Sequence, residues 1–207
     1  MTRLSLAFGS RDARFYSGNM RMASEVPQAN IAGTLVARFL AHYQFAPALQ
    51  TATYVHAAVT LGTGVTVTVT TAITNPDFPR NVTIKGNAGG IAGNVVVTGT
   101  NFAGDVITDT IALNGSSEVA GVKAFRTVTS ILLPARTQAS DTVSIGVGVK
   151  FGLPHIPFNA AALLLKLFNG STDAGTLAVD SDELEKNLFT LAGTADGAKL
   201  VDLIYIV

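Results

Sequence analysis

The stretch Gly93–Gly115, GNVVVTGTNFAGDVITDTIALNG, carries the clearest structural pattern in the chain. Small apolar and hydroxyl-bearing residues alternate through 93–101 and again through 105–114, and the turn-forming sequence NFAGD separates them. Alternation with a period of two is typical of a half-buried β-strand, and a short link that contains glycine is typical of a turn between strands. The sequence therefore predicts two strands joined by a turn.

The same alternation recurs from Tyr54 onward, where Val, Ile and Thr dominate and glycine-rich, Asn-rich or Pro-rich turns separate the segments. No long amphipathic helix pattern interrupts these segments, which argues against a parallel sheet built from βαβ units. The sequence predicts an all-β fold, an antiparallel β-sandwich of jelly-roll or Ig-like type with an extended N-terminal arm. The other strands are expected at 53–61, 64–73, 80–86, 124–133, 141–150, 160–168, 175–180, 187–192 and 200–207.

Two domain boundaries follow from changes in the pattern. Residues 1–50 are expected to form the arm, because their arginines and aromatic residues lack the period-two alternation. Ile31, Leu35, Phe39 and Tyr43 share a helical spacing, so part of the arm is expected to be either a short helix or a strand. Residues 51–207 are expected to form the sandwich domain, in which 151–207 either forms a sub-lobe or completes the same sheets. The apolar strand 200–207 is expected inside a sheet, because an exposed edge of this kind invites aggregation.

The composition points to a covered, weakly charged surface. Hydrophobic residues make up 48% and charged residues 14% of the 207 residues, whereas an average soluble domain has roughly 25% charged residues. Residues 1–50 carry a net charge of +3 and the remainder −3, so the arm suits an acidic partner surface or a solvated role. We expect no disulfide, since there is no Cys. We also expect no secretion signal and no membrane span, because the longest apolar run, 161–168, is far shorter than the roughly 20 residues required.

No pattern predicts a catalytic, cofactor or metal site. His42, His56 and His155 lack a second ligand at metal spacing and are expected to be packing or surface residues. The acidic segment 180–186 is expected to be a solvated turn rather than a calcium loop, which would need a glycine. Asp105 and Asp109 are expected on an outward strand face. The basic residues are too dispersed for nucleic acid.

The central sequence RNVTIKGNAGGIAGNVVVTGTNFAGDVITDTIALNGSSEVAGVKAFRTVTSILLP, followed by VSIGVGVKFGLPH and a strand-rich end, resembles virion structural proteins of tailed bacteriophages. The resemblance covers about residues 80–207, and capsid decoration (cement) proteins are the nearest likeness. It implies a non-enzymatic protein that binds the outer surface of the major capsid protein, stabilises the shell, and assembles as a homotrimer. It also implies synthesis in the host bacterial cytoplasm before incorporation into the virion.

The arm is expected to bind the shell, because arginine and aromatic side chains are favoured interface anchors. A tail, baseplate or fibre-associated virion protein is the first alternative function. A carbohydrate-binding module is the second, although the chain has no Trp and few aromatic residues between 53 and 150 to stack on a sugar. The residues expected to contact the capsid are Arg3, Arg11, Arg14, Phe15, Tyr16 and Arg21.

Overall fold

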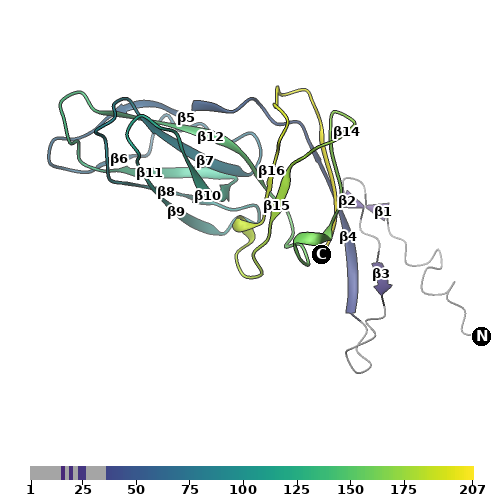
Figure 1. Cartoon of the computed structure of the whole chain (residues 1–207). Coiled ribbons are helices and arrows are strands. Elements are labelled where there is room, and N and C mark those ends of the chain that lie inside the picture. Colours follow the sequence, from purple (N-terminus) through teal and green to yellow (C-terminus); the bar gives the residue numbers. More distant parts are fainter. Residues whose placement is uncertain (1–14, 17–18, 21–22, 27–35) are drawn as a thin grey trace, which may run out of the picture.

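The computed structural model describes residues 15–16, 19–20, 23–26 and 36–207, and their alternating sequences fold as antiparallel sheets (Figure 1). The all-β prediction is confirmed. A six-stranded sheet contains β10 (Val119–Phe125), β7 (Arg80–Gly86), β12 (Thr142–Gly152), β16 (Leu188–Thr190) and β15 (Thr176–Ala178), and β5 (Thr51–Thr60) also pairs with β12. A four-stranded sheet has the order β6 (Val67–Val69), β11 (Thr127–Leu133), β8 (Asn94–Thr100) and β9 (Val106–Ala112).

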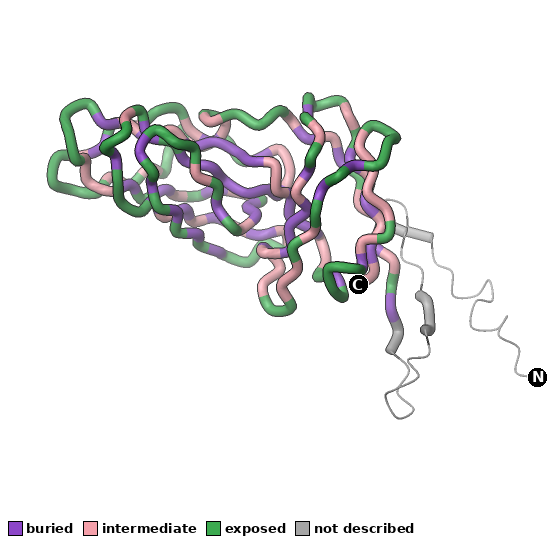
Figure 2. Tube along the Cα trace, viewed as in Figure 1, coloured by how far each residue is buried: buried purple, intermediate pink, exposed green. Residues whose placement is uncertain are grey.

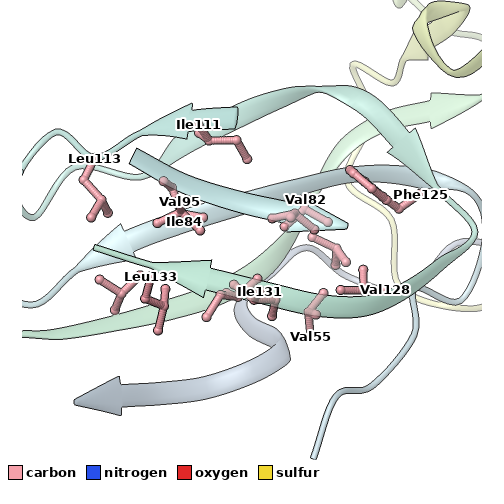
Figure 3. Packing of buried hydrophobic residues seen from close by; sticks show 14 of the residues in the cluster. Val55, Val82, Ile84, Val95, Ile111, Leu113, Phe125, Val128, Ile131 and Leu133 are labelled. Atoms are coloured by element: carbon pink, nitrogen blue, oxygen red, sulfur yellow. The ribbon is translucent and has the colours of Figure 1, made fainter. Parts of the chain in front are cut away.

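These two sheets pack face to face as a β-sandwich. Their inward side chains form one apolar core, to which Val55, Val82 and Ile84 come from the six-stranded sheet and Val95 and Ile131 from the four-stranded sheet (Figure 3). All five side chains are fully buried. Burying an aliphatic side chain of this size contributes roughly 1.5–3 kcal/mol, so this core is the main source of stability of the sandwich.

The predicted turn between β8 and β9 has a clear physical basis. The side-chain oxygen of Asn101 accepts hydrogen bonds from the backbone N–H groups of Gly104 and Asp105, each at 3.0 Å. Gly104 has a φ of +99°, which a residue with a side chain rarely adopts. The NFAGD sequence therefore closes the hairpin with its own side-chain hydrogen bonds, and the two strands stay in register from Asn94↔Ala112 to Thr100↔Val106.

A third, five-stranded sheet lies beside the end of the sandwich (Figure 1). Its order is β14 (Ser171–Thr172), β13 (Leu163–Phe168), β17 (Val201–Ile206), β4 (Val36–Phe45) and β3 (Ala23–Val26). The apolar strand predicted at 200–207 is the middle strand of this sheet, as expected. A small hairpin, β1 (Phe15–Tyr16) with β2 (Asn19–Met20), completes the described strands, and β2 lies next to β4.

The strand β4 departs from the interpretation of residues 1–50 as an arm with a short helix. Val36–Phe45 is extended and pairs with β17 along the whole length of β17, from Leu40↔Ile206 to Phe45↔Val201. The helical spacing of Phe39 and Tyr43 is therefore misleading, because both belong to this strand, in which Tyr43 stacks on Phe45 and Phe39 is exposed. Residues 36–45 are part of the folded body, and the boundary at residue 50 is not a boundary in the structure.

A second apolar core links the five-stranded sheet to the sandwich. Phe45, Leu203 and Tyr205 come from the five-stranded sheet, and Phe151 and Phe189 come from β12 and β16. Strand β12 therefore serves both cores, with its first half in the sandwich and its last residues in this second core. Buried segments lie on both sides of the junction (Figure 2). Residues 151–207 thus divide, since β15 and β16 extend the six-stranded sheet while β13, β14 and β17 build the third sheet.

Two strand predictions differ in detail from the structure. Only Val67–Val69 of the predicted strand 64–73 is paired, as a short edge strand, β6. The predicted strand 124–133 is two strands, β10 and β11, which belong to different sheets and meet at Arg126. Helical structure in the described residues is limited to the 3₁₀ turns η2 (Ala160–Ala162) and η3 (Leu184–Lys186), and no described helix has the length and apolarity to span a membrane.

Candidate functional site

The residues predicted to contact a capsid lie mostly outside the described part of the chain. Arg3, Arg11, Arg14 and Arg21 are outside the described residues. Phe15 and Tyr16 form β1, which pairs with Asn19 and Met20 of β2. The structure therefore places the two aromatic positions in a hairpin that leads to the edge of the five-stranded sheet.

Arg80 organises the junction between the sandwich and the segment that leads from β4 to β5. Its side chain is fully buried. Its Nε donates to the carbonyl of Gly148 at 2.7 Å, its Nη2 donates to the same oxygen, and its Nη1 donates to the carbonyl of Ala48 and to Asp77 Oδ1, each at 3.1 Å. The guanidinium also lies 4.6 Å from the ring centroid of Phe151. One cation therefore ties β7, β12 and the 46–50 segment together.

Asp77 completes this junction. Its Oδ2 accepts a hydrogen bond from the N–H of Ala48 at 2.6 Å, while Oδ1 binds Arg80. Burial lowers the pKa of Arg80, and the nearby carboxylate of Asp77 opposes that change. Burial raises the pKa of Tyr43 well above its ordinary value, and the charge of Asp77 adds to this effect. These ionisable groups therefore hold the junction together.

The acidic segment 180–186 is an ion-pair cluster rather than the solvated turn that was predicted. Lys123 of β10 donates to Glu183 at 2.8 Å and to Glu185 at 3.1 Å. Glu185 is only 7% exposed, and it also accepts a hydrogen bond from Asn101. Lys186 contacts Glu183 as well. The solvated-turn prediction fails because Lys123, some sixty residues earlier in the sequence, neutralises the acids.

The pKa values in this cluster follow its pairing. Burial alone would lower the pKa of Lys123, but its hydrogen bonds to Glu183 and Glu185 outweigh burial, and the pKa is raised. The hydrogen bond from Lys123, followed by that from Lys186, lowers the pKa of Glu183. Backbone N–H groups of Glu183 and of residue 182 lower the pKa of Asp180. All of these groups are therefore charged at neutral pH and hold the turn against β10.

Asp109 is buried, so its predicted place on the outward face is wrong. Residues of β9 alternate between exposed and buried, and Asp109 is 6% exposed and shares the inward face with Ile107 and Ile111. Its Oδ2 accepts hydrogen bonds from the N–H groups of Val122 and Lys123, at 2.8 and 3.2 Å. These groups lie where the pairing of β10 with β7 shifts register. Asp109 thus satisfies donors that a bulge leaves without a strand partner.

The histidines do not form a metal site within the described residues. His42 Nε2 lies 2.7 Å from Asp202 Oδ1 across β4 and β17, and His56 Nδ1 lies 2.7 Å from the carbonyl of Ala57. His155 lies in the segment between β12 and η2. The described residues contain no group of three or more histidine and acidic side chains that could hold a metal ion.

Large apolar side chains are exposed at one end of the five-stranded sheet. Phe158 is 52% exposed and Leu164 57% exposed, and Phe39 and Ile156 are also well exposed. The N–H of Phe158 donates to the carbonyl of Ile206, and Phe39 exchanges backbone hydrogen bonds with residue 207. Phe39 and Phe158 therefore lie beside the C-terminal end of β17, and Leu164 lies in β13 next to Leu163, which pairs with Tyr205. We call Phe39, Ile156, Phe158 and Leu164 the apolar end of the sheet. Sequence reasoning missed them because their common location depends on pairing between β4 and β17.

A groove crosses the outer face of the six-stranded sheet. Its central cleft has a volume of about 400 Å³ and is lined by Gln50, Asn81, Thr83, Glu118, Val149 and Lys150. A neighbouring cleft shares Gln50, Glu118 and Val149, and another shares Lys150. The three clefts together form what we call the Thr83 groove. None of its lining residues is aromatic, and the central cleft combines an ammonium, a carboxylate, two carboxamides and a hydroxyl.

Comparison of the chain with protein-family models, with curated proteins and with solved structures returned no match.

Proposed function

We propose that this chain is a structural protein of a tailed-bacteriophage virion, a decoration protein that binds the outer surface of the capsid shell and stabilises it. The resemblance of residues 80–207 to virion structural proteins supports the proposal. A protein in this role needs extended contact surfaces and a rigid body rather than reactive groups. Many copies bound side by side make individually weak contacts effective, because each bound copy raises the local concentration of neighbouring sites.

The observation that carries the proposal is the apolar end of the five-stranded sheet. Phe39, Ile156, Phe158 and Leu164 are each exposed, in a chain that has only 14% charged residues. Clusters of exposed apolar side chains mark interaction surfaces in soluble proteins. Residues 1–22 precede β3 in the sequence, and β3 is the edge strand of this same sheet, beside β4. The proposal assigns the arm and the apolar end to one binding region. The proposed assembly is a homotrimer that meets the major capsid protein through this region.

Deletion of residues 2–22 tests the role of the arm. The deletion leaves β3 and its pairing with β4 intact, so the truncated protein is expected to fold with an unchanged circular dichroism spectrum. It is expected to lose co-sedimentation with empty capsids of the virus that encodes it. Full retention of binding by the folded, truncated protein would show that the arm assignment is wrong.

Point variants separate specific contacts from general charge. Replacing Arg3, Arg11 and Arg14 together by Gln is expected to weaken capsid binding. The matched control replaces three basic residues of the sandwich together by Gln, the exposed Lys85 and Arg126 and the partly exposed Arg136, so that both variants lose three positive charges. Equal loss in both variants would mean that binding depends only on net charge. Sedimentation equilibrium of the purified protein tests the trimer, and a stable monomer without affinity for any viral particle would refute the whole proposal.

Immunolabelling of intact virions separates the shell from the tail. Label distributed over the capsid faces is the expected result. Label confined to a tail tip or baseplate would instead assign the chain to the tail, baseplate or fibre, which is the alternative virion location.

A further inference from the structure

The floor of the Thr83 groove is built on the outer face of β7. Thr83 pairs with Gly146 of β12 and Ala120 of β10, and it lies on the opposite face of the strand from Val82 and Ile84, whose side chains enter the core. Thr83 is nevertheless only 1% exposed, because neighbouring groups form walls around it. The groove is thus a recess in a sheet face that would otherwise be flat.

The hydroxyl of Thr83 is a buried polar group without a hydrogen-bond partner in the structure. Such a group costs stability, and valine, which has the same shape, would avoid this cost. Its neighbour Asn81 is fully engaged, since its oxygen accepts from the N–H of Lys150 and its amide donates to the carbonyl of Gly121. A threonine at this position is explained if a bound group completes its hydrogen bond.

Lys150 supplies a cation at the same place. In the described structure its ammonium has no ion pair, whereas Lys123, Lys186 and Lys199 each contact a carboxylate. The other charged group of the cleft, Glu118, accepts a hydrogen bond from Gln50 at 2.8 Å and is not paired with a cation. The central cleft therefore offers one cation and one hydroxyl to an anionic group, and one carboxylate to a hydrogen-bond donor.

We propose that the Thr83 groove binds an extended peptide segment that carries an acidic side chain. The carboxylate of that side chain accepts hydrogen bonds from the ammonium of Lys150 and the hydroxyl of Thr83. Hydrogen bonds to charged groups are shorter and stronger than neutral ones, so this pair would hold the peptide in place. A backbone N–H of the peptide donates to Glu118, and the flanking clefts accept the residues on either side. The inference stands independently of the capsid proposal, because the residues that hold the peptide, Thr83, Glu118 and Lys150, lie outside residues 1–50.

NMR titration tests the proposal directly. The probes are two capped pentapeptides, acetyl-Gly-Val-Glu-Val-Gly-amide and the same peptide with Gln in place of Glu, together with acetate, all added to the full-length ¹⁵N-labelled protein. We expect saturable shifts of the amide signals of Thr83, Val149 and Lys150 with the Glu peptide. Equal shifts with the Gln peptide, or none with either, would overturn the proposal. Acetate binding as tight as that of the Glu peptide would overturn the peptide assignment.

Three variants give the titration its controls. Thr83→Val is expected to raise the melting temperature of the free protein. It is also expected to weaken binding of the Glu peptide by about tenfold or more, because one hydrogen bond to a charged group is lost. Lys150→Met is expected to weaken it similarly. Lys85→Met removes an exposed lysine two residues from Thr83 on the same strand and is expected to leave binding unchanged. A Thr83→Val protein that is less stable and binds the peptide normally would show that the hydroxyl is structural.

Discussion

Replacing Arg80 by methionine should strongly destabilise the protein. Methionine keeps most of the aliphatic length of arginine, so packing against Phe151 is largely preserved. The change removes the donors to Gly148 and Ala48 and the charge that faces Asp77. The variant thus isolates the polar contribution of Arg80 at the junction of the two cores.

The magnitude follows from what is left behind. Removing one partner of a buried ion pair costs roughly 3–5 kcal/mol, and a buried carbonyl without a donor costs roughly 1–3 kcal/mol. Asp77 keeps its hydrogen bond from Ala48 and is partly exposed, so the cost of leaving its carboxylate without Arg80 should lie at the low end of the ion-pair range. We expect a total loss of about 4 kcal/mol, against a typical total stability of roughly 5–15 kcal/mol. For a chain of this size each kcal/mol shifts the melting temperature by roughly 2–4 °C, so it should fall by roughly 8–16 °C.

Differential scanning calorimetry and urea unfolding measure this effect, and a double-mutant cycle with Asp77→Asn assigns it. Arg80→Lys retains the charge but not the planar set of guanidinium donors, so its stability should lie between those of the wild type and Arg80→Met. The two single losses should sum to more than the loss in the double variant, because each leaves the other partner uncompensated. A loss below about 1 kcal/mol in Arg80→Met would refute the assignment of Arg80 as the main polar contact of the junction.

Two further predictions concern the buried charges. Asp109→Ala should lower the free energy of unfolding in urea by about 2–3 kcal/mol, because it leaves the backbone N–H groups of Val122 and Lys123 without an acceptor. Thr108→Ala, on the exposed face of β9, should change it by less than about 0.5 kcal/mol. Equal effects of the two variants would contradict the role of Asp109 at the bulge. The loss of stability caused by Lys123→Met should be largest near neutral pH, where Lys123 and the glutamates it contacts are all charged. The wild-type advantage should be lost at acid pH, as the pH falls through the lowered pKa of Glu183, and at alkaline pH, as it rises through the raised pKa of Lys123. A pH-independent difference would contradict the ion-pair reading.

Strands whose two faces differ chemically could be predicted from the sequence. Residues 80–86 form β7 as predicted, and the 93–101 and 105–114 predictions exceed β8 and β9 by only one or two residues. The pattern succeeds there because alternate side chains enter one core. It also contained a signal for Asp109 that was overlooked, since Asp109 shares odd numbering with Ile107 and Ile111, and alternation alone places all three on one face.

The features that the sequence pattern did not predict depend on contacts between distant segments. Strand β10 has an irregular burial pattern because its register shifts at the bulge, so no period of two marks it. Strand β4 is read as arm because its partner β17 lies at the opposite end of the sequence. The Thr83 groove likewise combines residues from β7, β12 and the 46–50 segment. Its recess becomes visible only when these segments are brought together.

The pairing of β4 with β17 has a consequence for the durability of the molecule. His42 and Asp202 face each other across this ladder although 160 residues separate them in sequence. Strands β4 and β17, near the two ends of the folded body, are therefore held together by backbone hydrogen bonds and by side chains packed in the second core. A single proteolytic cleavage in an exposed loop, such as that at 103–105, would leave two fragments that stay associated through the pairing of β4 with β17.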